Sequence, residues 1–211
     1  MFPRELFVEH VSLDKTYNAK GLDDLMNGRI DLFVSYTKED KLEEVQSRVP
    51  LLKKVVLLYD PLAFYVHADN KVRDLSAAQI RDIYTGKIQN WKELGDSDET
   101  ITTYHLTSRA NVSGAAFDNI VSGIHLDANH QERDSMPEIV DTVADDSSAL
   151  ANIFWSYEAK MYANKNTRLI TVDGKNCKDK DYPFLFPIYM FYDGANPKQQ
   201  LHQLVQYLQS E

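Results

Sequence analysis

Two side chains of this sequence, Arg109 and Ser113, have the types and the spacing that suit the binding of a small anion. They belong to the segment Arg109-Ala-Asn-Val-Ser113-Gly-Ala, which lies between a predicted strand at 101–106 and an apolar pattern with helical spacing. The first N–H groups of a helix lack partners within the helix, and the helix dipole places partial positive charge there. Arg109 would add a permanent charge in a planar fork, and Ser113 a hydroxyl donor. Taken alone, these residues do not establish an anion site. A surface arginine beside a serine that caps a helix is the alternative interpretation, and the residues by themselves favour it.

The elements that must position this segment are predicted from the patterns upstream of it. The apolar and aromatic run Leu62–His67 predicts a strand. Ser76 is expected to cap a helix, with Gln79 three residues later in a capping-box arrangement, and Gly86 is expected to end it. Trp91 then provides an apolar anchor for the chain as it folds back. This order predicts a strand, a helix and a second strand before the anion-binding segment.

A similar unit is predicted near the start of the chain. The pattern predicts a strand at Leu6–Leu13, a helix that Gly28 ends, and a strand at Ile30–Tyr36. Ser35 and Tyr36 stand at the end of this second strand, where a solvated strand end is the alternative to a ligand contact. Further strands are predicted at 51–59, 149–155, 167–172 and within 182–194, and helices at 38–48, 138–143, 158–163 and 197–209.

The composition argues against several classes of function. Lys and Arg number 23 against 32 Asp and Glu, and the resulting net charge of −9 argues against nucleic acid as a partner. The single cysteine, Cys177, cannot form an intrachain disulfide framework. We find no apolar run long enough to span a membrane, and we expect that the leader of an exported form has been removed from this sequence.

No arrangement of residues typical of catalysis or of metal binding is evident. The histidines His67, His105 and His202 are scattered, and no Ser-His-Asp or paired-carboxylate arrangement follows from their spacing. His125 and His130 lie in a polar stretch without a recognised metal-ligand spacing, and we expect them to be hydrated loop residues. The sequence therefore predicts a protein that is not an enzyme and that has neither a metal nor a cofactor.

A long stretch of the chain resembles a known family of binding proteins. The segment from Asp69 to Gly95, followed by the segment Arg109–Phe117, is similar to the signature of the phosphate-binding components of ABC-type phosphate importers. Members carry a helix with the pattern L-x-x-x-Q-h-x-x-I-a-x-G-x-I-x-x-W, where h is hydrophobic and a is aromatic. An R-x-x-x-S-G-T loop that grips phosphate follows this helix. The residues that match the helix pattern are Leu75, Gln79, Ile83, Tyr84, Gly86, Ile88 and Trp91.

The resemblance implies both a fold and a function. The fold would be α/β, a two-lobed type II periplasmic-binding-protein-like fold truncated at the N-terminus, with lobe one at 1–64 and 168–211 and lobe two at 65–167. The chain would act outside the cytoplasm as a solute-binding protein for phosphate or a similar oxyanion, without a cofactor, and would work with an ABC permease. The ligand-binding residues implied are Arg109, Ser113, Gly114, Ala115, Ser35 and Tyr36.

Three departures from the family pattern affect the implied site. Ala115 replaces the threonine of the S-G-T triplet, and Tyr36 stands where many members carry a small polar or acidic residue. We also expect the chain to lack the strand and phosphate loop that normally precede the first unit. We expect the gap to be filled either by a segment exchanged within a homodimer or by rearrangement of Leu6–Leu13. The departures also leave open a relative without transport function that acts as an interaction or sensory domain and binds no anion.

Overall fold

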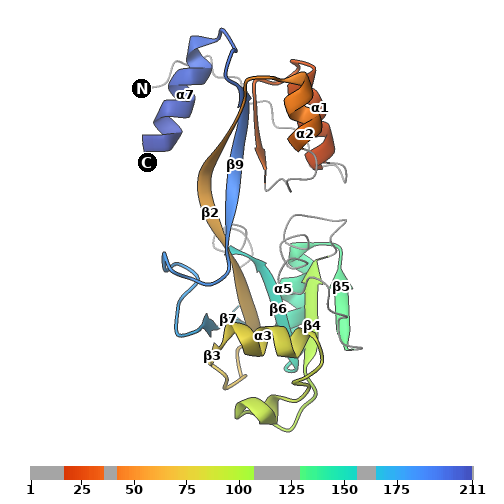
Figure 1. The fold of residues 1–211 in the computed structure, drawn as a ribbon. Coiled ribbons are helices and arrows are strands. Elements are labelled where there is room, and N and C mark those ends of the chain that lie inside the picture. Colours follow the sequence, from red (N-terminus) through yellow and green to blue (C-terminus); the bar gives the residue numbers. More distant parts are fainter. Residues whose placement is uncertain (1–16, 36–41, 107–128, 156–164, 211) are drawn as a thin grey trace.

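The structure is a computed structural model that describes residues 17–35, 42–106, 129–155 and 165–210. These residues form two α/β lobes connected by two long strands, β2 (Leu52–His67) and β9 (Leu185–Asp193) (Figure 1). Lobe one also contains α1 (Tyr17–Met26), β1 (Leu32–Ser35), α2 (Leu42–Arg48) and α7 (Gln199–Ser210). To lobe two we assign β3 (Asp74–Leu75), α3 (Ala77–Tyr84), the 3₁₀ helix η2 (Trp91–Leu94), β4 (Thr102–Leu106), β5 (His130–Arg133), α5 (Met136–Asp145), β6 (Ala149–Phe154), β7 (Thr167–Leu169) and β8 (Thr171–Val172).

The strand β2 runs without a break from lobe one into lobe two. Its first part pairs antiparallel with β9, from Leu52 opposite Asp193 to Pro61 opposite Leu185. From Leu62 onward β2 pairs antiparallel with β6. The sequence predicted two separate strands here, and that prediction was wrong because the chain stays extended through Pro61. The side chains of β2 are partly exposed in lobe one and become buried from residue 60 onward.

The sheet of lobe one has the strand order β1-β9-β2 and carries helices on both faces. Met190 of β9 packs with Leu201 and Val205 of α7. The next residue, Phe191, faces the other side because side chains alternate along a strand, and its ring centroid lies 6.1 Å from that of Phe33. Helix α1 approaches Phe33 closely enough that a Cβ at Gly21 would overlap the aromatic ring. The predicted closing helix is thus confirmed as α7.

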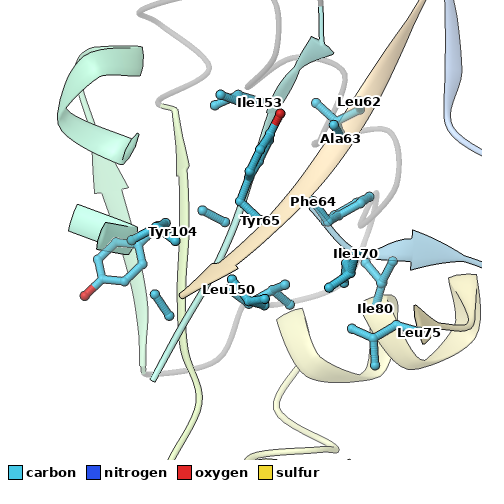
Figure 2. Close-up of a cluster of buried hydrophobic side chains, with 14 of the residues drawn as sticks. Leu62, Ala63, Phe64, Tyr65, Leu75, Ile80, Tyr104, Leu150, Ile153 and Ile170 are labelled. Atoms are coloured by element: carbon cyan, nitrogen blue, oxygen red, sulfur yellow. The ribbon is translucent and has the colours of Figure 1, made fainter. Parts of the chain in front are cut away.

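The sheet of lobe two has the strand order β2-β6-β4-β5, with β4 parallel to both of its neighbours. Helices α3 and α5 cover opposite faces of this sheet. Tyr84 at the end of α3 bonds to Asn152, whereas Tyr104, in register with Ala151, faces the end of α5. Because Ala151 and Asn152 are consecutive in β6, their side chains point to opposite faces. The main core lies between these layers, and Figure 2 shows part of it.

The helix that carries the family-like pattern has the caps that the sequence predicts. The Ser76 Oγ accepts a hydrogen bond from the Gln79 N–H at 3.0 Å, and Gln79 Oε1 accepts one from the Ser76 N–H at 2.8 Å. Gly86 follows the helix with a φ of 73°, a conformation that glycine adopts without strain. Trp91 is fully buried, and its indole N–H donates to the Ser148 carbonyl at 2.9 Å. The capping box and the apolar anchor are therefore confirmed.

The predicted strand at 167–172 is replaced by two short strands with different partners. Thr167–Leu169 pairs with β2 as β7, whereas Thr171–Val172 pairs in parallel with β3 as β8. Ile170 between them is buried in the main core together with later residues of this segment, Val172, Cys177, Tyr182 and Phe184. The predicted lobe boundaries stay a prediction. From this packing we propose that residues 167–184 belong to lobe two and that the second crossing between lobes lies in β9.

Candidate functional site

The carboxyl ends of strands from both lobes point toward the boundary between the lobes (Figure 1). In lobe one, β1 and β2 are both antiparallel to β9, so β1 runs in the direction of lobe two and ends at Ser35. In lobe two, β6 is antiparallel to β2, and β4 is parallel to β6, so both strands run back toward lobe one. In α/β folds, ligands bind outside the carboxyl ends of strands, which makes this boundary the candidate site.

The structure places the predicted site residues only in part. Ser35 is the last residue of β1, and its backbone is in register with Tyr189 of β9. Strand β4 ends at Leu106, shortly before Arg109 in the sequence. The remaining predicted site residues lie outside the described residues: Tyr36, Arg109, Ser113, Gly114 and Ala115. The structure therefore describes the strands that lead into the predicted ligand segments, and the contacts of those residues stay a prediction.

Strand β4, which leads into the predicted anion segment, makes polar contacts on the face that α3 covers. Thr103 is buried, and its Oγ1 lies 2.9 Å from Nδ1 of His130 in β5. The Tyr84 hydroxyl donates to the Tyr104 carbonyl at 3.4 Å and accepts from Nδ2 of Asn152 at 3.0 Å. These bonds connect β4 to its neighbouring strands and to helix α3.

The opposite face of β4 is also held by polar contacts. The Tyr104 hydroxyl donates to Asp146 Oδ2 at 2.9 Å, and the Arg133 guanidinium lies 4.7 Å from the centroid of the Tyr104 ring. At the start of the strand, the Ser148 hydroxyl donates to Thr102 Oγ1 at 2.9 Å. Strand β4 is thus connected through side chains to α3, β5, β6 and the turn after α5.

The surroundings of Tyr84, Tyr104 and His105 shift the pKa values of these side chains. Burial, followed by the hydrogen bond to Asp146, raises the pKa of Tyr104 to about 12. Burial raises the pKa of Tyr84 as well, so both phenols remain neutral donors at neutral pH. Burial, with a smaller contribution from the charge of His130, lowers the pKa of His105 to about 3. Tyr84, Tyr104 and His105 are consequently uncharged at neutral pH.

Of the two histidines expected to lie hydrated in a loop, one has a different setting. His130 begins strand β5, is half-buried, and lies beside Thr103, so that expectation was wrong for His130. The four residues of β5 form too short a pattern to predict a strand. His125 lies outside the described residues. Within the described part of the chain, no three His, Cys, Asp or Glu side chains gather in a group that could hold a metal ion.

The order and pairing of the strands define a class of protein. A mixed α/β architecture with two lobes and two crossing strands is that of the type II periplasmic-binding-protein-like fold. Residues 9–211 match the PBP superfamily domain, and the chain belongs to that superfamily. The predicted fold class is therefore confirmed.

Similar proteins include several whose names refer to phosphate. The chain is 26% identical to the phosphate-binding protein PstS of Bacillus subtilis over 201 residues, 92% of this chain and 64% of that protein. A structure from Clostridium perfringens, assigned as a phosphate ABC transporter substrate-binding protein with bound phosphate, has 29% identity and a TM-score of 0.69. That match covers 91% of this chain and 78% of the other. The chain thus spans less than two thirds of the Bacillus protein.

The fold is also shared with more distant proteins. An ABC-type phosphate transport receptor from Vibrio cholerae has 21% identity and a TM-score of 0.67, and the match covers 92% of this chain and 79% of that receptor. At this identity the likeness shows the fold alone. Among the described residues, no helix has the length and the apolar character needed to cross a membrane.

Proposed function

We propose that this chain binds phosphate or a similar oxyanion as the solute-binding part of an ABC-type importer, and that it acts outside the cytoplasm. The observation that carries the proposal is the direction of two strands. Strand β4 runs toward lobe one and leads into the segment with Arg109, while β1 runs toward lobe two and ends at Ser35. Similar proteins are named for phosphate binding and for phosphate transport, which supports the choice of ligand.

In this proposal the ligand is held by donors from both lobes. Arg109 supplies a charged, planar fork, and Ser113 supplies a hydroxyl. The N–H groups of Gly114 and Ala115 add the partial positive charge of a helix start. The segment around Ser35 and Tyr36 contributes from lobe one. The proposed activity is binding and release without catalysis or a cofactor, consistent with relatives that are named as binding proteins.

Isothermal titration calorimetry with phosphate and with sulfate tests this function. The wild-type chain should bind phosphate, and Arg109→Ala should weaken binding by about 10- to 150-fold, the equivalent of roughly 1.5–3 kcal/mol for a hydrogen bond to a charged group. Arg109→Lys should recover part of the affinity, because lysine keeps the charge but loses the fork. Arg29→Ala is the control, since Arg29 pairs with Asp24 on the surface of lobe one.

The titrations test two points separately, namely whether the chain binds phosphate and whether Arg109 belongs to the site. Absence of phosphate binding by the wild-type chain would contradict the proposed ligand. Equal affinities for the wild type and Arg109→Ala would show that Arg109 is a surface residue outside the site. The proposed location is tested by fractionating cells that produce the natural protein, and the proposed permease partner by its co-purification with the binding protein.

A further inference from the structure

The strand β4 differs from the other central strand of lobe two in the chemistry of its side chains. Strand β6 is almost entirely apolar, whereas the first four residues of β4 are Thr102, Thr103, Tyr104 and His105. All four are at least partly buried, and Thr103 and His105 are each 2% exposed. A strand in this position could be packed almost entirely by apolar residues, as β6 is, so its polar character requires an explanation.

The polar groups of β4 take part in bonds that fix the strand relative to its surroundings. On the α3 face, Thr103 reaches His130, and the Tyr104 carbonyl accepts from Tyr84, which is itself bonded to Asn152. On the α5 face, the Tyr104 hydroxyl donates to Asp146. Shifting β4 along its axis would therefore break bonds on both faces of the sheet.

Buried polar groups contribute little net stability, but they penalise alternative arrangements. A buried donor or acceptor that loses its partner costs more than the bond contributes when it is made. An apolar contact, by contrast, changes little when a strand slides by a fraction of an ångström, because hydrophobic attraction is not directional. The bonds around β4 are consequently suited to fixing its position more than to raising the stability of the lobe.

We propose that Tyr84 and Thr103 are positioning residues for the anion site, acting through β4. This inference rests on the proposed function. Strand β4 ends at Leu106 and the chain reaches Arg109 three residues later, so the position of the strand sets where the anion segment begins. Binding sites lose affinity when their donors are displaced by even a small distance. Tyr84 and Thr103 therefore contribute to phosphate affinity without touching the ligand.

The test compares three variants that each remove a single buried hydroxyl. Tyr84→Phe removes the bond from α3 to the Tyr104 carbonyl of β4, and Thr103→Val removes the bond from β4 to His130 of β5. Both substitutions nearly keep the shape of the side chain. Tyr182→Phe is the matched control, because Tyr182 is also buried and its hydroxyl donates to the Leu62 carbonyl of β2 at 3.0 Å. Calorimetric titration with inorganic phosphate gives the Kd and the stoichiometry separately, and hydrogen exchange reports the amides of Thr102–Leu106.

A positioning role and a merely structural role give different results. We expect Tyr84→Phe and Thr103→Val each to raise the phosphate Kd by between about twofold and tenfold, the range for a neutral hydrogen bond, and to speed exchange in β4. Tyr182→Phe should leave the Kd unchanged. A purely structural residue would lower the folded fraction, and hence the stoichiometry, at constant Kd.

Three results of these titrations would overturn the positioning role of Tyr84 and Thr103. Unchanged Kd values in both β4 variants, with wild-type binding intact, would overturn this inference and leave the proposed function standing. A Kd raised equally in Tyr182→Phe would also overturn it, because the effect would then be general to the core. Failure of the wild-type chain to bind phosphate would overturn the proposed function and this inference together.

Discussion

The imidazole rings of His105 and His130 lie with their centroids 4.3 Å apart and their planes tilted by 34° in lobe two. Burial and the neighbouring imidazole lower the pKa of His105 from 6.5 to about 3. Below pH 6.5, His105 becomes protonated in the unfolded chain but stays neutral in the folded chain. The free energy of unfolding should therefore fall as the pH drops from 6.5 toward 3, by at most ~1.4 kcal/mol per pH unit.

The variant His105→Gln should remove this dependence, because glutamine does not titrate. Urea denaturation at pH 7 and at pH 5 measures the effect as the difference in unfolding free energy. His202→Gln in α7 serves as the control and should keep the wild-type difference, since it leaves His105 in place. A wild-type chain whose free energy of unfolding is the same at both pH values would contradict the lowered pKa of His105.

Arg168 joins β7 to the loop between β2 and β3. Its Nη2 donates to the carbonyls of Asn70 at 2.6 Å and of Val72 at 2.8 Å. Arg168→Ala removes both bonds, so the free energy of unfolding should fall by about 1.5–3 kcal/mol. The same substitution at Arg29, an exposed partner of Asp24, should cost less than about 1 kcal/mol. Equal losses in the two variants would contradict the proposed role of Arg168.

Trp91 anchors the segment between α3 and β4. Its side chain is fully buried, and its N–H bonds to the Ser148 carbonyl. Trp91→Phe removes this bond and leaves unfilled space, and should lower the free energy of unfolding by about 2–4 kcal/mol. Trp155→Phe is the control at a half-buried site, where Lys178 lies 4.7 Å from the ring centroid, and should cost about 1 kcal/mol. Thermal unfolding followed by circular dichroism ranks the two, and a reversed order would be inconsistent with this packing.

The state of association stays a prediction from the sequence. Residues 6–13 lie outside the described residues, so the structure does not test whether a segment is exchanged between copies or rearranged within one. Multi-angle light scattering of the purified chain distinguishes these cases by mass. Exchange predicts a dimer of twice 24.2 kDa, and rearrangement predicts a monomer.

Local patterns in the sequence predicted most elements of the fold. The Ser76 cap with Gln79 and the stop at Gly86 involve neighbours a few residues apart, so local chemistry is sufficient to predict them. The strand β6 and the helix α7 likewise follow from an apolar run and from helical spacing. These elements match because their hydrophobic pattern agrees with the burial that the fold provides.

Other features depend on partners distant in the sequence. The continuity of β2 through Pro61 follows from pairing with β9 more than a hundred residues later, and the break at Ile170 follows from two different partners. The half-buried setting of His130 required knowledge that β5 lies beside β4. Local patterns carry no information about such pairings. The predicted anion residues Arg109 and Ser113 lie outside the described residues and stay a prediction.

The continuous strand β2 has a mechanical consequence for the two lobes. Because β2 and β9 run along the line that joins the lobes, a force that pulls the lobes apart acts along two backbones that are already extended. Neither backbone can lengthen much further. A rotation of one lobe about the same line requires only a change in the twist of the ribbon, and two-stranded ribbons tolerate a wide range of twist. The connection is therefore stiff in tension and compliant in torsion.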